Sequence, residues 1–453
     1  MNSQREAEIN YLEQYYEKPG SHIVVIYGEH GIGKTALTMN FVSGKDYVYL
    51  LATNESERSL CYQFARELEM EGAELPEYPS FTQIWEEILR VRSRKKVIIL
   101  DEFQNLVKNS DTFMNELVGL VKKSFDQQEV LVLLCSSTVG WVENSMIRKM
   151  GRAALELAGL LKLKELPFKT LRGAYSAYSF EECVRMYAVL GGIPAYWNCF
   201  DKELSIEENI CRTIIDPAGV LYHEAQRLVG EELRELVVYN TILSAMAQGR
   251  NKLNELYRHT GFSRAKISVY LKNLMELELV EKVFSFDTEG RANSQKGIYR
   301  IKNSFVEFYY TFVYPHQGKL TTMTPAQFYD SYIRKSIDSF CNRCFKNLCL
   351  EYLDRQGSYS RKGEWLGKTG NLDLVLQNEN QEATIGLCSF DKAVTLEDYE
   401  WFLFCAGKAK IVPDHIEIFS GVGFDKPLLA EEKRNRILTL NLLENLRFEE
   451  EMR

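Results

Sequence analysis

The chain has 453 residues, which is about three times the typical domain length of ~150, so it is expected to fold as several domains. Hydrophobic residues make up 45% of the chain and charged residues 26%, and this globular composition excludes a wholly disordered, collagen-like or coiled-coil protein. The net charge of −8 excludes a general polyanion binder, although a basic module can lie within an acidic chain.

The amino terminus and the cysteines predict a cytoplasmic protein. Charges begin at Arg5 without a following apolar core, so the first segment does not resemble a secretory signal. No apolar run reaches the ~18 residues that cross a bilayer, and no membrane contact is expected. The ten cysteines lie mostly in apolar stretches, as buried thiols of a reducing compartment do. Cys341 and Cys344 form a C-x-x-C without a second pair at zinc spacing, which disfavours a metal or redox role.

Residues 22–160 alternate short apolar runs with helical segments. The β-like runs, rich in Val, Ile, Leu and Tyr, are 22–27, 46–52, 96–100 and 129–135. Between them, 81–93 and 112–125 carry apolar residues every three to four positions, which predicts amphipathic helices. Apolar strands separated by helices indicate a parallel sheet covered on both faces. The fold class is therefore α/β, with a nucleotide-binding architecture in outline.

The rest of the chain changes character at two points. Residues 171–231 are helical and aromatic, broken by the turn GGIP at 191–194, and are predicted to form a helical lid. Within 232–302, one helix ends at Gly261 and the next opens with Ser263 as its N-cap. With a helix before them and two strands after them, they predict a winged helix-turn-helix. From 303 onward come aromatic helices, a strand pair at 372–376 and 383–390, and a charged helical tail.

A phosphate-binding loop directly follows the first β-like run, because residues 28–35 fit G-x-x-x-x-G-K-[ST] at every position. The predicted nucleotide-binding residues of this loop are Gly28, Glu29, His30, Gly31, Ile32, Gly33, Lys34, Thr35 and Ala36. The glycines let backbone N–H groups turn toward phosphates, the lysine reaches the β- and γ-phosphates, and the threonine hydroxyl binds Mg²⁺. His30 occupies an unconstrained position and is not expected to do chemistry.

Two carboxylates end the run at 96–100. Asp101 is predicted to hold Mg²⁺ beside the loop, and Glu102 is predicted to orient or deprotonate a water that attacks the γ-phosphate. A pair of helix N-cap residues at a strand end is the alternative interpretation. With the phosphate loop upstream, the paired carboxylates favour hydrolysis of a nucleotide over its storage.

Two other groups near the predicted site keep open interpretations. Ser136, Ser137 and Thr138 end the run at 129–135, where a hydroxyl, Ser137 in particular, can sense the γ-phosphate or position water, or the cluster can form a turn. Arg148 or Arg152 can neutralise charge in the transition state, or both can belong to a solvated basic turn.

The assembly resembles the archaeal-type P-loop ATPase family, a group within the AAA+/STAND NTPases. The matching pieces are the first segment Arg5-Glu6-x-Glu8, GEHGIGKT, VIILDEF, CSST, the turn at 150–152 with LKLKELPF, the lid motif LGGIPAYW and the winged helix. The resemblance implies Lys34 and Thr35 at phosphate and Mg²⁺, Asp101 on Mg²⁺, Glu102 as the base, and Arg152 near the γ-phosphate or a neighbouring subunit. It leaves oligomerisation and an unknown protein partner open.

Family members usually carry a C-terminal domain that looks like a restriction endonuclease. Such a site needs a helix acid, a strand Asp and a Glu-x-Lys on the next strand. Asp373 stands where the strand Asp is expected and Glu351 can be the helix acid, but the Glu-x-Lys position reads Leu387-Cys388-Ser389 and Lys392 lies past the strand. The nuclease site is therefore predicted to be inactive. The predicted domains are a P-loop core over 1–170, the lid over 171–231, the winged helix over 232–302 and the nuclease-like domain over 303–453.

The winged helix is the basic module of an acidic chain. Residues 232–302 hold twelve Lys and Arg against eight Asp and Glu, which gives a charge of +4 and leaves −12 for the rest. Arg264, Lys266 and Lys272 fall on the predicted recognition helix, and Arg291 and Lys296 fall in the wing. Binding of duplex DNA is the favoured interpretation, and a protein-interaction module is the alternative.

The predicted function is a Mg²⁺-dependent ATPase that couples hydrolysis to conformational switching of the winged helix, which binds DNA or protein. The alternative is a nucleotide-gated DNA-binding regulator with little ATP turnover. The intact Asp101-Glu102 pair argues against this alternative, while the winged helix argues for it.

Overall fold

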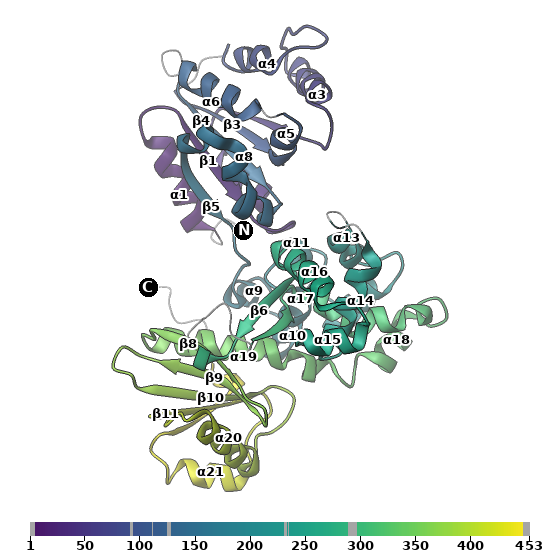
Figure 1. Ribbon diagram of the computed structural model, residues 1–453, viewed down its shortest axis with the longest axis vertical. Coiled ribbons are helices and arrows are strands. Elements are labelled where there is room, and N and C mark those ends of the chain that lie inside the picture. Colours follow the sequence, from purple (N-terminus) through teal and green to yellow (C-terminus); the bar gives the residue numbers. More distant parts are fainter. Residues whose placement is uncertain are drawn as a thin grey trace. The chain divides into compact units, whose positions relative to one another are not determined.

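The computed structural model describes residues 5–90, 94–110, 112–124, 128–230, 233, 235–288 and 297–446. The chain forms two compact units, shown in Figure 1. The first unit is Met1–Leu166 together with the short stretches Ile193–Ala195 and Glu276–Glu278, and the second unit contains the remainder.

The first unit is built on a five-stranded parallel sheet in the order β2-β3-β4-β1-β5. Its strands are β1 (His22–Tyr27), β2 (Tyr47–Leu51), β3 (Lys96–Asp101), β4 (Val130–Ser136) and β5 (Leu157–Lys162). The four strands predicted from the sequence are confirmed, and β5 was not predicted. The parallel sheet with helices between its strands confirms the α/β fold class.

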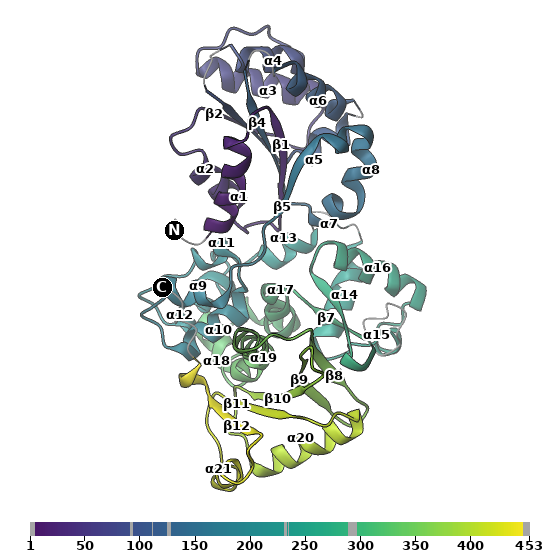
Figure 2. The same ribbon diagram turned by 90° about the vertical axis from the view of Figure 1, so that its left-hand side faces the viewer.

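Helices cover both faces of this sheet. Figure 2 shows α1 and α2 on one side of it and α5 and α8 on the other. The helices are α1 (Glu6–Glu17), α2 (Lys34–Phe41), α3 (Glu57–Met70), α4 (Phe81–Ile88), α5 (Gln104–Asn109), α6 (Phe113–Ser124), α7 (Val139–Trp141) and α8 (Ile147–Met150). A π-helix, Val142–Met146, joins the last two, and a 3₁₀ helix, Gly151–Glu156, follows α8.

Strand β1 shows why the sheet is buried on both sides. Ile23 and Val25 face the cluster formed with α3 to α6, while Val24 and Ile26 point to the opposite face, and all four are almost fully buried. A strand that alternates buried residues on both faces needs a continuous apolar run, which HIVVIY supplies.

The second unit begins with short helices that match the predicted helical lid. They are α9 (Phe168–Ala174), α10 (Phe180–Leu190), α11 (Pro194–Trp197), α12 (Ile206–Ile210), a π-helix (Cys211–Ile215) and α13 (Glu224–Gly230). Ser179 and Ser205 open α10 and α12 with capping boxes, in which each serine accepts from the backbone N–H three residues on. The first two residues of α11 belong to the Ile193–Ala195 stretch of the first unit.

Three helices and a strand pair follow, as the winged helix-turn-helix prediction requires. They are α14 (Leu236–Ala247), α15 (Leu253–Thr260), α16 (Arg264–Glu276), β6 (Val280–Phe284) and β7 (Gly297–Ile301). Gly261 ends α15 with a φ of 73°, and Ser263 accepts from the N–H of Lys266 at 3.2 Å. Arg291 and Lys296 of the wing lie outside the described residues.

The C-terminal part is a mixed sheet in the order β12-β11-β10-β9-β8. After α17 (Ser304–Phe308), α18 (Pro325–Tyr332) and α19 (Ile337–Gln356) come β8 (Arg361–Leu366), β9 (Asn371–Gln377), β10 (Ala383–Ser389), α20 (Leu396–Ala409), β11 (His415–Ser420), α21 (Lys426–Glu432) and β12 (Leu438–Leu442). The pairs β8–β9 and β9–β10 are antiparallel and the remaining pairs are parallel. Side chains of α20 and α21 pack on one face of the sheet, and α19 contacts β9 and β10.

One sequence prediction for this part is wrong. The segment predicted as a charged helical tail contains β11 and β12 as well as α21, because alternating apolar residues in both runs let them pair beside β10. Among the described residues, no helix has the length and apolar character needed to span a membrane.

Candidate active site

The phosphate loop lies between β1 and α2. Gly31 and Gly33 have φ values of 77° and 98°, which an L side chain rarely adopts. A Cβ at Gly28 would stand 2.7 Å from the carbonyl oxygen of Leu163. Glycine is therefore required at these three positions for conformational or steric reasons.

Lys34 is anchored inside the loop in this structure. Its side chain is almost fully buried, and Nζ donates to the carbonyl oxygens of Gly28 at 2.9 Å and Glu29 at 3.1 Å. Burial lowers the pKa of Lys34, while the nearby carboxylates of Glu102 and Asp101 oppose that shift. The ammonium therefore lies within reach of the loop's own backbone, where a phosphate would lie.

Asp101 meets the start of α2 at the carboxyl end of β3. Its Oδ2 accepts from the Thr35 hydroxyl at 3.3 Å and from the Tyr49 hydroxyl at 2.6 Å, and its Oδ1 accepts from the N–H of Glu102 at 2.9 Å. Burial and the bond to Asp101 raise the pKa of Tyr49, so this phenol remains a donor. Hard oxygen ligands from Thr35 and Asp101 fit a magnesium ion.

Glu102 is held from two directions. Its φ of 52° is in the left-handed region, and its Oε2 accepts from the Ser137 hydroxyl at 2.7 Å and from the Ser137 N–H at 3.2 Å. The side-chain amide of Gln104 donates to the same oxygen. The carboxylate predicted to be the base is thus bound to the end of β4 and the start of α5.

Gln104 itself is not fully satisfied. Its side chain is 4% exposed, and Oε1 is a buried oxygen with no hydrogen-bond partner among the residues the structure describes. An unpaired buried amide oxygen costs ~1–3 kcal/mol, so this arrangement is one the protein retains against a penalty.

The structure brings most of the predicted site residues together. Arg148 and Arg152 are the two that it does not connect to them. Lys34, Thr35, Asp101, Glu102 and Ser137 converge at the carboxyl ends of β1, β3 and β4, and Ala36 is exposed at the start of α2. The Arg5 guanidinium donates to the carbonyl oxygen of Ile32 at 3.0 Å, which connects the first predicted segment to the loop.

Arg148 and Arg152 lie on α8 and on the 3₁₀ helix after it, and both are exposed. Neither makes a hydrogen bond or ion pair with a described residue, so a role at the γ-phosphate is still a prediction. Sequence reasoning missed Tyr49 and Gln104. The D-E-x-Q spacing was a readable signal for Gln104, whereas Tyr49 gave none.

No described group of three or more His, Cys, Asp or Glu side chains could hold a metal ion, and this includes Cys341 and Cys344 on α19. In the C-terminal part, Glu351 forms an ion pair with Arg355, one turn along the same helix α19. Asp373 accepts from the N–H of Cys388 at 3.0 Å, and burial raises the pKa of its carboxyl.

Glu364 is the carboxylate near Asp373 that sequence reasoning missed. It receives two hydrogen bonds from Arg300, at 2.8 and 3.1 Å, and one from Lys346 at 2.9 Å. Burial alone would raise its pKa, but the bonds from Arg300 and the charge of Lys346 outweigh burial and lower it. Both Glu364 oxygens are therefore engaged by cations of the protein.

The predicted DNA-contacting residues of α16 are at the surface. Arg264 donates to Asn254 at 2.8 Å and stacks over Tyr257, and Lys266 lies 3.7 Å from Glu235. Lys272 and Val269 are exposed farther along the helix.

Comparison with known families accounts for three segments of the chain. A family described as an ATPase domain predominantly from Archaea matches residues 3–198. Residues 3–198 are therefore similar to this archaeal ATPase domain. The arsR family of bacterial regulatory proteins matches 240–282, and archaeal and bacterial proteins of unknown function match 309–398. The resemblance stated from GEHGIGKT, VIILDEF and the winged helix is confirmed.

Known proteins that are similar to most of the chain share little sequence identity with it. An uncharacterised protein of Methanocaldococcus jannaschii is 25% identical over 438 residues, covering 89% of this chain and 95% of that protein. A Walker-type ATPase of Pyrococcus abyssi is 16% identical with a TM-score of 0.47, covering 68% of this chain and 95% of that one. The ORC2 protein of Aeropyrum pernix, solved as ADPNP-ADP complexes, is 16% identical with a TM-score of 0.48, covering 70% and 95%.

Proposed function

We propose that the protein hydrolyses ATP in the presence of Mg²⁺. The observation that carries this proposal is the convergence of Thr35, Asp101 and Glu102 at the phosphate loop, with Lys34 buried among its carbonyls. Such a set supplies a phosphate cradle, oxygen ligands and a carboxylate base at one sheet edge. The archaeal-type ATPase domain supports the same assignment.

Each residue has a separate task in this proposal. Lys34 leaves its backbone partners and binds the β- and γ-phosphates, and Thr35 and Asp101 would hold the metal. The metal would neutralise charge on the phosphates when bound. Glu102 accepts a proton from the water that attacks the γ-phosphate. Arg152 is retained as the candidate cation for transition-state charge, supplied by this chain or a neighbouring subunit.

The contacts of Glu102 in this structure bear on how readily it can act as the base. Its Oε2 is shared by Ser137 and Gln104, so the carboxylate has two donors competing with any water for the same oxygen. We infer that these donors hold Glu102 in a resting position. In this proposal Ser137 also responds to the γ-phosphate, which is one of the two interpretations that the sequence left open.

Turnover and binding separate the roles of Lys34 and Glu102. Lys34→Ala should weaken ATP binding more than about tenfold, because a charge-assisted contact to phosphate is lost. Glu102→Gln should retain binding but reduce turnover by about 10²–10⁴-fold, the usual contribution of a general base. Phosphate release and nucleotide titration measure the two effects, with Lys108→Ala on α5 as the control. Turnover that survives in Glu102→Gln would remove Glu102 as the base.

In the proposed switch, the winged helix is the part whose binding activity changes. We propose that it binds duplex DNA through the exposed face of α16, in keeping with its charge of +4 and its match to the arsR family of regulatory proteins. A regulator that binds DNA under control of bound nucleotide, with little turnover, is the second candidate. Phosphate release measured with and without duplex DNA distinguishes the two, since only the first predicts sustained turnover.

Salt dependence tests the DNA contact directly. Removing a phosphate contact by Arg264→Ala or Lys272→Ala should weaken binding at low salt and reduce the slope of log K against log salt by about one each. Lys335→Ala, an exposed lysine outside the winged helix, is the matched control. Absence of binding even at low salt would assign the winged helix to protein interaction.

We further propose that the C-terminal domain does not cleave nucleic acid. Arg300 and Lys346 occupy both oxygens of Glu364, and Leu387 and Ser389 stand where a nuclease needs Glu and Lys. Mg²⁺-dependent DNA cleavage that disappears in Asp373→Ala would overturn this proposal.

A further inference from the structure

The lid contains a cavity of about 560 Å³ that the proposed ATPase chemistry does not use. It lies between the chain after α11, the π-helix Cys211–Ile215 and the turn that follows this π-helix. Its volume is in the range of small-molecule sites in proteins, ~300–1,000 Å³. Its lining combines carboxylates, a guanidinium and apolar groups.

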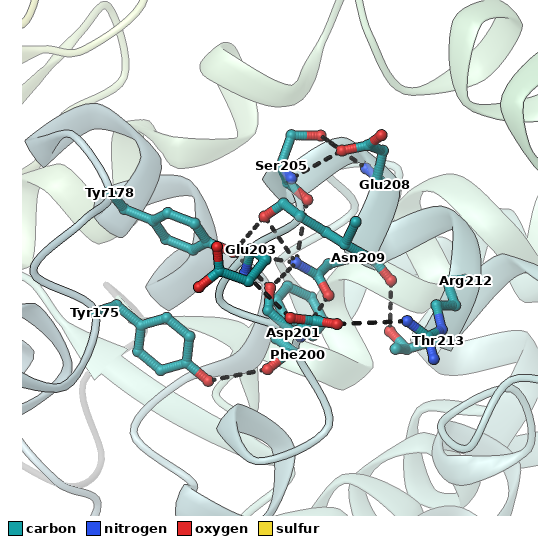
Figure 3. A network of polar contacts seen from close by, with 11 residues as sticks. Tyr175, Tyr178, Phe200, Asp201, Glu203, Ser205, Glu208, Asn209, Arg212 and Thr213 are labelled. Atoms are coloured by element: carbon teal, nitrogen blue, oxygen red, sulfur yellow. Dashed lines mark hydrogen bonds and ion pairs between the residues drawn. The ribbon is translucent and has the colours of Figure 1, made fainter.

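The first wall is fixed by buried side chains. Asn209 is fully buried, and its Oδ1 accepts from the N–H of Asp201 at 2.7 Å while its Nδ2 donates to the carbonyl oxygen of Asp201 at 2.8 Å. The Tyr178 hydroxyl donates to the same carbonyl at 3.0 Å. Figure 3 shows these side chains converging on Asp201. The backbone of Asp201 is therefore immobilised, and its carboxylate is presented from a rigid position.

The other two walls are locked to each other. Thr213 of the π-helix donates its hydroxyl to the carbonyl of Asn209 at 2.7 Å and accepts at its own carbonyl from the N–H of Leu221 at 2.9 Å. A Cβ at Gly219 would lie 2.5 Å from the Thr213 carbonyl oxygen, so only glycine permits this close approach. The cavity is thus largely preformed, as ligand sites are.

The charged side chains at the cavity make only weak contacts with one another. Arg212 and Asp201 are 3.6 Å apart with side chains 68% and 48% exposed, a loose pair of the kind that contributes little to stability. Asp216 accepts from the N–H of Ala218 through Oδ1 at 2.8 Å, and its Oδ2 makes no hydrogen bond within the described part of the chain. A ligand can therefore engage a guanidinium and two carboxylates without breaking a strong contact.

We propose that this cavity binds a small zwitterion, namely an α-amino acid or a short peptide with free ends. Arg212 would take the carboxylate, and Asp201 and Asp216 would take the ammonium group. Phe200 and Val220 supply apolar lining for a side chain. A nucleotide or other polyanion fits poorly, because two carboxylates against one guanidinium would repel its phosphates.

The test is calorimetric titration of the full chain with the standard free amino acids and a set of dipeptides, each up to about 10 mM. At least one free zwitterion should bind. Its amide and its N-acetyl derivative, which each lack one charge, should bind about tenfold to a hundredfold more weakly. Arg212→Gln and Asp216→Asn should weaken the free zwitterion by the same range.

Glu203→Gln is the matched control, because Glu203 is an exposed carboxylate beside the cavity that does not line it. It should bind as the unmodified chain does, and circular dichroism should show every variant folded. Three results would each overturn the proposal. They are no binding of any compound in the panel, capped derivatives that bind as tightly as the free zwitterion, or cavity variants that both bind the zwitterion as tightly as the unmodified chain.

Discussion

Glu102 owes its position to neighbours rather than to the acidic motif alone. Its backbone adopts a left-handed φ of 52°, which costs a non-glycine residue of order 1 kcal/mol or more, and its carboxylate is bound by Ser137 and Gln104. Strain of this kind persists only where surrounding contacts over-determine it. These contacts therefore hold the Glu102 carboxylate in a defined orientation.

Gln104→Leu tests whether that orientation restrains turnover. The substitution removes one donor to Glu102 and the unpaired amide oxygen, while Leu keeps a similar volume. A hydrogen bond to a charged group is worth ~1.5 kcal/mol, so basal phosphate release should rise up to about tenfold.

Asn105→Leu is the control for this variant, because Asn105 is the adjacent residue on α5 and its amide bonds to the carbonyl of Ala52 instead of to Glu102. Unchanged or lower turnover in Gln104→Leu, with ATP binding intact, would show that Gln104 supports Glu102 and does not restrain it.

Asp373 provides a pH test at the same scale. Burial raises the pKa of its carboxyl above the unfolded value of ~3.9, so the folded chain holds this proton more tightly than the unfolded chain. The stability from this group is present below the unfolded pKa and is lost as pH rises through the folded pKa. Relative to Asp373→Asn, the free energy of unfolding of the native chain should therefore fall as the pH rises above the unfolded pKa.

Denaturant titrations followed by tryptophan fluorescence at a series of pH values measure that difference. Asp354→Asn, which changes an exposed carboxylate paired with Lys362, is the control for removing a carboxylate at the surface. A difference that stays constant with pH would mean that Asp373 keeps an ordinary pKa.

The sequence predicted those residues of the candidate site that lie in continuous motifs. Lys34 and Thr35 follow from the loop pattern, and Asp101 and Glu102 follow from an acidic strand end, because each motif is continuous along the chain. Glu364, Lys346 and Arg300 were not predicted, since these partners come from separate elements and only the folded chain brings them together. The choice of Glu351 as the helix acid followed chain order, whereas its side chain pairs with Arg355.

At the scale of elements, prediction succeeded for strands with a continuous apolar run and missed strands that lack one. The strands β1, β3 and β4 read as continuous apolar runs because both faces are covered. Strand β5 is the edge of the first sheet, and its residues are only partly buried or exposed, so LAGLLK carries no such run. Strands β11 and β12 sit among charged residues, which concealed their alternation.

Capping signals defined helices more reliably than composition did. Gly261 and Ser263 end α15 and open α16 as expected, because a left-handed C-cap and a serine N-cap act within a few residues. The lid shows the opposite case. Its π-helix at Cys211–Ile215 leaves no readable pattern, although it forms one wall of the cavity beside Asp201.

At the scale of the molecule, the winged helix and the C-terminal sheet are joined within the second unit. The N–H of Leu366 donates to the Ser285 hydroxyl at 3.0 Å, and Arg361 donates to the carbonyl of Phe286 at 3.0 Å. Arg300 of β7 reaches Glu364 of β8. The predicted boundary at 302 therefore divides the sequence at a point where side chains tie both parts together.

The Arg300–Glu364 pair is the strongest of these ties and carries the last prediction. Both side chains are largely buried, at 18% and 11% exposed. Arg300→Met therefore leaves the buried Glu364 carboxylate with Lys346 as its remaining cation. This variant should lower the free energy of unfolding by about 3 kcal/mol. Replacing both partners with methionine should cost less than Arg300→Met, since no carboxylate is left with half its partners. Denaturant unfolding of both variants measures the difference, with Lys362→Met, at an exposed ion pair, expected to stay within about 0.5 kcal/mol. A double variant at least as unstable as Arg300→Met would mean that packing by the side chains, and not their charge pairing, joins the winged helix to the sheet.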